Sequence, residues 1–126
     1  MDTTILVELQ FEEGKKLLQK LDESGYKLPI AFWTILPENT SWELRLGMPK
    51  LKITGELQLH KIIHKILSDH SINLSFANIT LVDTTDPLCK MLRRRLKTGW
   101  DLQKIPYFGY YFNGYSFPDS IIYRVN

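Results

Sequence analysis

Three consecutive arginines, Arg93, Arg94 and Arg95, stand near the end of a segment that we predict to be helical. At about 100° per residue, Lys90, Arg93, Arg94 and Lys97 share one arc of that helix. Arg95 falls instead at the edge of the apolar face, where its stem can pack. Such a stripe can contact nucleic-acid phosphates without reading sequence. Cations at a helix C-terminus are also favoured by the helix dipole, so a solvated helix end explains the same residues.

Aromatic side chains follow this helix and support two different binding hypotheses. Proteins that bind single-stranded nucleic acid stack bases on rings beside cations, and Trp100 is the first ring after the stripe. Tyrosine also suits protein interfaces, because its ring buries area while its hydroxyl stays hydrated. Rings that simply complete the core explain the same tail. The nucleic-acid hypothesis therefore uses Lys90, Arg93, Arg94, Lys97 and Trp100, and the interface hypothesis uses Tyr107, Tyr110, Tyr111 and Tyr115.

The remaining chemical candidates have weaker patterns. His60 and His64 stand four residues apart, a spacing that can place two imidazoles on one metal ion. No glutamate occupies the metalloprotease position between them, and a third ligand such as Asp83 would have to come from folding. Boundary histidines are the favoured interpretation, and no cofactor is predicted. Cys89 lies near a predicted helix start, where a thiol can become reactive, but no cysteine-protease signature surrounds it, so an inert core thiol is favoured.

The composition is that of an ordinary globular protein. The chain has 126 residues, 44% hydrophobic and 24% charged, which is enough for one α+β domain spanning residues 1–126. The net charge of +2 is too small to imply a nucleic-acid or membrane partner by itself. A single cysteine and the lack of a signal-like or membrane-spanning apolar run predict a soluble cytoplasmic protein.

Hydrophobic periodicity predicts the elements that must position these residues. We expect a helix over residues 3–23, with a short strand at its start as an open alternative. A nearly all-apolar strand over 26–36, which should be central, pairs through a turn with a half-exposed strand over 41–48. A loop follows over 49–55. The later elements are a helix at 57–70, a strand at 73–82, a helix from Asp86-Pro87 to Gly99, and an aromatic hairpin tail at 106–125 turning at Asn113-Gly114.

The order is therefore α-β-β-α-β-α-β-β. It predicts a single α+β domain in which about three helices cover a largely antiparallel sheet of about five strands.

Three stretches carry a resemblance to a known family. Residues 25–33, residues 42–46, and Asp86-Pro87-Leu88 leading into Leu92-Arg93 resemble patterns in a family of small bacterial proteins for which no activity is established. The resemblance covers most of the chain, but its motifs are structural in type. It implies a similar small domain and transfers no functional residue.

Three functions are consistent with the sequence. The leading prediction is a non-enzymatic module that binds a protein partner or a second copy of itself through the tail tyrosines. The alternative is a nucleic-acid-binding accessory protein that uses the cationic stripe. A hydrolase or metal-dependent enzyme built on His60, His64 and Asp83 comes third.

Overall fold

The computed structural model describes residues 8–38, 41–51, 55–112 and 114–126. Its order confirms the predicted fold class, three helices on a five-stranded, mostly antiparallel sheet. The elements are α1 (Glu8–Glu23), β1 (Ile30–Thr34), β2 (Glu43–Met48), α3 (Glu56–Asp69), the 3-10 turn η1 (Phe76–Asn78), β3 (Ile79–Asp83), α4 (Pro87–Arg95), β4 (Ile105–Tyr107), β5 (Tyr111–Phe112), β6 (Tyr115–Ser116) and β7 (Ser120–Val125).

The main sheet has the strand order β3-β2-β1-β7-β4. β1 lies in the middle and pairs antiparallel with both β2 and β7, and all five of its residues are buried. This confirms the central strand that its apolar run predicts. Among the described strands only β2 and β3 pair in parallel, because α3 lies in the connection that carries the chain back between them.

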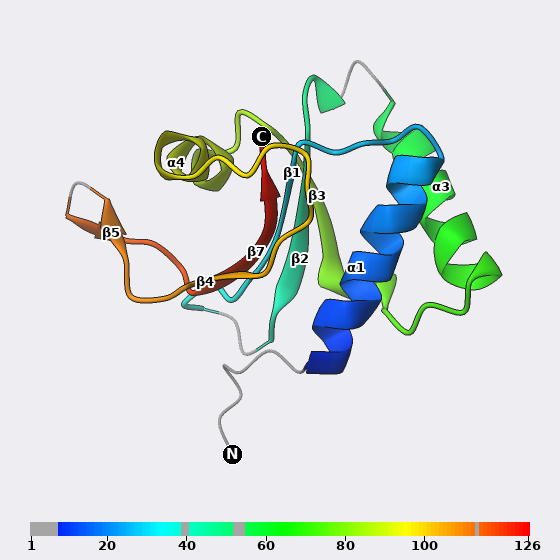
Figure 1. The fold of residues 1–126 in the computed structure, drawn as a ribbon, viewed down its shortest axis with the longest axis horizontal. Helices are drawn as coiled ribbons and strands as arrows, with labels where there is room; N and C mark the ends of the chain where they lie inside the picture. The colour runs from blue at the N-terminus through cyan, green and yellow to red at the C-terminus, as the bar shows by residue number, and fades with distance from the viewer. Residues whose placement is uncertain (1–7, 39–40, 52–54, 113) are drawn as a thin grey trace.

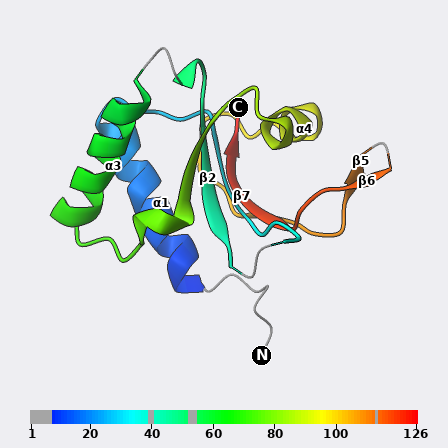
Figure 2. The ribbon, with the colours of Figure 1, turned by 180° about the vertical axis from the view of Figure 1, so that it is seen from behind.

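Helices cover the two faces of this sheet unequally. α1 and α3 lie on one face, and the shorter α4 lies on the other, on the same side as the β5–β6 hairpin (Figure 1). The view from behind shows the same three layers (Figure 2). Each face has its own apolar cluster, and the one beneath α4 includes Phe32, Cys89, Leu92 and Ile122.

Tyr123 joins three elements at the centre of the larger cluster. Its buried hydroxyl accepts a hydrogen bond from Trp33 Nε1 at 2.8 Å and donates one to the backbone oxygen of Phe11 at 2.5 Å. α1 can approach this closely because Gly14 has no side chain, and a Cβ there would collide with the Tyr123 hydroxyl. Glycine is a weak helix former, yet the packing requires it at this position.

Three predicted boundaries are wrong or lie partly outside the described residues. α1 is described from Glu8 onward, so the alternative strand is wrong for residues 8–11, and residues 3–7 lie outside the description. In the loop over 49–55, residues 52–54 also lie outside it. The strand expected over 73–82 begins only at Ile79, because Ser75 caps a 3-10 turn by accepting a hydrogen bond from Ala77 N–H.

The predicted end of α4 is also wrong. The helix stops at Arg95 rather than at Gly99, and Leu96 is already extended at φ −131°. Tertiary bonds account for the early stop, since Thr98 N–H donates to Val125 O at 2.8 Å and Val125 N–H donates to Thr98 Oγ1 at 2.9 Å. The helix therefore ends before Thr98, and Thr98 pairs with Val125 of β7 instead.

The aromatic tail forms two hairpin arrangements rather than one. β5 and β6 make a small separate sheet with Tyr111 opposite Ser116, as the Asn-Gly signal predicts, although Asn113 itself lies outside the described residues. β4 and β7 instead extend the main sheet. The chain turns at Gly109, whose φ is 70°, and Tyr107 stacks on Tyr110 across this turn.

Candidate functional site

The start of α4 is fixed by Asp86. Its carboxylate accepts a hydrogen bond from Leu88 N–H at 3.0 Å, and Pro87 occupies the first turn, as the sequence predicts. Arg45 of β2 pairs with Asp86 at 3.3 Å and with Glu43 at 2.6 Å. These contacts tie the start of the helix to the sheet, while Cys89 and Leu92 form its buried face.

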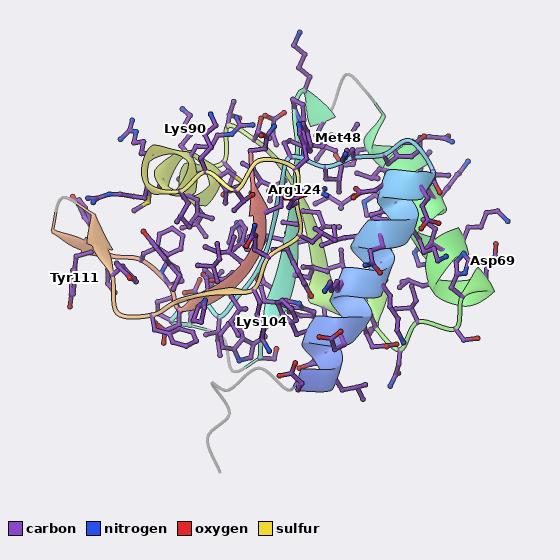
Figure 3. The ribbon with its side chains drawn as sticks, viewed as in Figure 1. Met48, Asp69, Lys90, Lys104, Tyr111 and Arg124 are labelled. Carbon is purple, nitrogen blue, oxygen red and sulfur yellow. The ribbon has the colours of Figure 1, made fainter. Side chains whose placement is uncertain are left out.

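That outer face carries the cationic stripe. Lys90, Arg93, Arg94 and Lys97 are all exposed, and Figure 3 shows Lys90 on the outer side of α4. Arg93 Nε donates to the backbone oxygen of Asn126 at 3.1 Å, whereas the other three form no ion pair with a described residue. Lys97 lies beyond the last helical residue, so three cations follow the helix and the fourth continues from an extended segment.

Arg95 also lies on the helix and is exposed, like Arg93 and Arg94. Burial raises the pKa of Tyr107, and the Arg95 charge acts on it in the opposite direction. Arg95 therefore interacts electrostatically with the aromatic tail, and the packing of its stem on the apolar face stays a prediction.

Trp100 lies against cations other than those of the stripe. The residue is 42% exposed, and its ring lies 5.5 Å from Lys27 Nζ and 5.5 Å from the guanidinium carbon of Arg124. It lines a polar depression of about 600 Å³ together with the α1 residues Lys15 and Gln19. Its combination with the four cations of the stripe stays a prediction.

The tail tyrosines separate into one buried ring and three exposed ones. Tyr107 is only 5% exposed and stacks on Tyr110 at 4.1 Å between ring centroids, so it is not a surface ring. Tyr110, Tyr111 and Tyr115 are 49%, 67% and 75% exposed. Phe108, at 51%, belongs with them, although the predicted interface set omits it. Its place next to Gly109, where the chain turns, is the signal that could have found it.

The exposed rings occupy a hairpin that projects from the body of the molecule. β5 and β6 extend away from the main sheet on the same side as α4, and Tyr111 lies on this projection (Figures 1 and 3). We call Phe108, Tyr110, Tyr111 and Tyr115 the hairpin rings. Burying such rings is favourable, and few contacts with the body cover them.

The histidine pair packs on an aromatic ring. His64 stacks on Phe76 at 4.1 Å with an interplanar angle of 5°, and His60 lies against the same ring at 4.9 Å. Within the described ranges, no three His, Cys, Asp or Glu side chains are placed to hold a metal ion. Sequence spacing could not reveal Phe76, because the turn that presents it was expected to be a strand.

Asp83 and Cys89 also have structural roles. The Asp83 carboxylate accepts hydrogen bonds from Leu51 N–H at 2.9 Å and from Thr85 N–H at 3.0 Å, which lower its pKa, so it caps a turn instead of joining the histidines. Cys89 is fully buried, and burial raises the pKa of its thiol to about 12. Such a thiol is not a nucleophile at neutral pH, in agreement with the favoured interpretation.

Comparison with known proteins adds no assignment to this geometry. No protein-family model, no curated protein and no solved structure matches the chain. Among the helices in the part of the chain that the structure describes, none has the length and apolar content to cross a membrane.

Proposed function

We propose that the protein is a non-catalytic binding module that holds a partner protein through its hairpin rings. The observation that carries this proposal is the exposure of Phe108, Tyr110, Tyr111 and Tyr115 on one projecting hairpin. Interfaces concentrate their binding free energy in a few aromatic side chains that become buried on association. The proposed activity needs no cofactor.

The charge around the hairpin suggests the chemistry of the partner. The exposed cations of α4 stand on the same side of the sheet as the hairpin (Figure 1). A partner that offers an apolar surface bordered by Asp or Glu side chains would satisfy both features. A reducing cytoplasm is the setting we propose, since the chain has one cysteine and relies on no internal disulfide.

Site-specific photocrosslinking followed by a binding measurement tests this proposal. A benzophenone amino acid at Tyr111 should give a discrete protein adduct in native cells, and the same group at exposed Leu9 of α1 should give none. With the identified partner purified, Tyr111→Ser combined with Tyr115→Ser should weaken binding at least about tenfold, as expected for hot-spot rings.

Leu9→Ser is the matched control, because Leu9 is 57% exposed and belongs to α1, on the face of the sheet opposite the hairpin (Figure 1). It should leave the affinity unchanged. Equal effects of the hairpin and control variants would contradict the proposal.

The second candidate function is binding of single-stranded nucleic acid along α4. It is favoured by the exposure of Lys90, Arg93, Arg94 and Lys97, none of which forms an ion pair with a described residue. Neutralising any one of the four should then reduce the salt dependence of binding by about one unit, whereas Arg95→Ala should not. Oligonucleotide titrations at several salt concentrations measure this slope, and no binding at low salt would exclude the candidate.

A further inference from the structure

The two edges of the main sheet are protected to different degrees. At one end, β4 is only three residues long and contains Pro106, which has no N–H to offer another strand. At the other end, β3 has five residues, no proline and no lysine. Proteins usually protect an open edge with such residues, so an unprotected edge points to a use for it.

The backbone groups on the open side of β3 follow from its register. Thr84 N–H donates to Met48 O at 3.3 Å, so this amide points toward β2. Backbone groups of successive strand residues point to alternate sides, and the β2–β3 register is regular over all five pairs. Thr80 and Val82 therefore also point toward β2. The groups of Ile79, Leu81 and Asp83 point away from it, toward the edge.

Two of those six edge groups are already used within the chain. Ile79 N–H donates to Phe76 O in the 3-10 turn, and Asp83 O accepts from Asp86 N–H at 2.9 Å. The groups left without a described partner are two donors, Leu81 N–H and Asp83 N–H, and two acceptors, Leu81 O and Ile79 O. Leu81, Val82 and Asp83 are half-buried and also line an open depression of about 630 Å³, so solvent reaches this edge.

These four groups complement a second copy of themselves. In an antiparallel pairing with a two-fold axis at Leu81, each Leu81 N–H faces the Leu81 O of the other copy. The same register places each Asp83 N–H opposite the Ile79 O of the other copy. All four of these groups are then paired. The remaining two, Ile79 N–H and Asp83 O, would face each other in this register, and each already has a partner within its own chain.

The side chains tolerate the same arrangement. Ile79 would lie opposite Asp83 of the other copy, Thr80 opposite Val82, and Leu81 opposite Leu81, so no like charges meet across the strands. Leu81 packs with the apolar cluster beneath α1 and α3, and Val82 packs with the cluster beneath α4. Each cluster would therefore continue into the same cluster of the second copy. α3 would then lie on the same face as α3 of the second copy.

We propose that the chain forms a two-fold homodimer by antiparallel pairing of β3 with β3 of a second copy, which makes one continuous ten-stranded sheet. The number of strands is twice the five of the main sheet. This inference goes beyond the binding module proposed above, since it uses the opposite end of the sheet from β4 and leaves the hairpin rings free.

The mass in solution is the first test. The mass measured by light scattering should rise with concentration, from 14.8 kDa toward twice that value. Replacing the Leu81 amide with an ester removes one outward N–H without altering a side chain, and it should weaken dimerisation at least tenfold. The same replacement at Val82 removes an N–H that points toward β2 and weakens the Leu81 carbonyl as an acceptor. It should lower the thermal midpoint, and it should weaken dimerisation less than the Leu81 ester does.

Disulfide trapping tests the register itself. Thr80→Cys mixed with Val82→Cys should crosslink rapidly on mild oxidation, because opposite residues lie within disulfide range, whereas either variant alone should crosslink slowly. Leu81→Cys alone should crosslink with itself. The native Cys89 does not compete, because it is buried. Circular dichroism confirms that each variant is folded.

Three results would overturn the inference. The first is a constant mass of 14.8 kDa at every concentration, and the second is equal crosslinking by Thr80→Cys alone and by its mixture with Val82→Cys. The third is loss of the dimer in the double variant Tyr111→Ser, Tyr115→Ser. The hairpin variant also separates the two proposals. A dimer that persists in this variant while partner binding is lost supports both, and a dimer with no crosslinked partner at Tyr111 supports the dimer alone.

Discussion

Arg124 of β7 and Asp22 of α1 form a bidentate ion pair across the molecule. Nη1 and Nη2 donate to the two carboxylate oxygens at 3.1 and 2.7 Å, and the Arg124 side chain is only 1% exposed. The same guanidinium donates to Leu28 O at 3.0 Å and to Trp100 O at 2.8 Å. Figure 3 shows Arg124 within the body of the molecule, where it connects a helix, a strand and two loops.

Removing the carboxylate partner should therefore be costly. Asp22→Asn should lower the free energy of unfolding by about 2–3 kcal/mol, somewhat less than for a fully buried pair because the Asp22 side chain is 22% exposed. Urea denaturation measures the loss. Asp69→Asn breaks an exposed pair with Lys65 and should leave the urea midpoint nearly unchanged. Equal effects of the two variants would show that Arg124 finds other partners.

Gly14→Ala should destabilise the protein although alanine is the better helix former. The added Cβ collides with the Tyr123 hydroxyl and comes within 3.1 Å of Trp33 Nε1, and overpacking of this kind costs about 1–3 kcal/mol. Tyr123→Phe alone should cost a similar amount, because Trp33 Nε1–H and Phe11 O lose their partner. The double variant should cost less than the sum, since phenylalanine removes the colliding atom. Thermal denaturation of the three variants completes the cycle.

Stability should fall in acid partly through Glu13. Its buried carboxylate accepts hydrogen bonds from Lys16 Nζ at 2.8 Å and from Asn73 N–H at 2.7 Å, which lower its pKa below the ordinary 4.5. A depressed folded-state pKa contributes stability above the unfolded value, and that stability is lost as pH falls through the folded-state pKa. Glu13→Gln should therefore be less stable than wild type at pH 7. The difference in unfolding free energy between the two proteins should narrow as the pH falls below 4.5, the ordinary pKa of a glutamate.

The adjacent and exposed Glu12 supplies the control for this pH series. The unfolding free energy of Glu12→Gln should follow that of wild type from neutral pH into acid. A gap between wild type and Glu13→Gln that stays constant with pH would mean that the lost contact is not electrostatic.

Cys89 should resist alkylation in the native state. Burial keeps its pKa at about 12, so almost no thiolate is present near pH 8, and the sulfur is not accessible. Mass spectrometry after iodoacetamide treatment should detect the unmodified chain under native conditions and complete modification in denaturant. Rapid native labelling would reveal opening of α4 from the sheet.

The sequence predicts those features whose cause is local. Asp86 and Pro87 begin a helix because the cap and the proline act within one turn, and an all-apolar stretch predicts the buried β1. The early end of α4 was not predictable, because it depends on Thr98 pairing with Val125, a residue 27 positions away. The same reason applies to the histidines, since nothing near them in sequence indicates that both rings pack on Phe76.

The same limit applies to the candidate site residues. Helical projection separates Arg95 from the stripe by using only positions along one helix, and that separation stays a prediction. Projection cannot indicate that Tyr107 is buried or that Trp100 lies against Lys27, since both depend on how distant segments meet. The open edge of β3 required knowledge of the strand order.

The position of β7 between β1 and β4 has a consequence for protein synthesis. A ribosome releases β1, β2 and β3 long before β7, so the central strand emerges with one side unpaired and its apolar residues uncovered. β7 can pair with β1 only after residues 120–125 have left the exit tunnel. The buried hydrogen bonds of Tyr123 and Arg124 can form only then. Nascent chains stalled before β7 should be sensitive to protease and should bind holdase chaperones, whereas released chains should resist digestion.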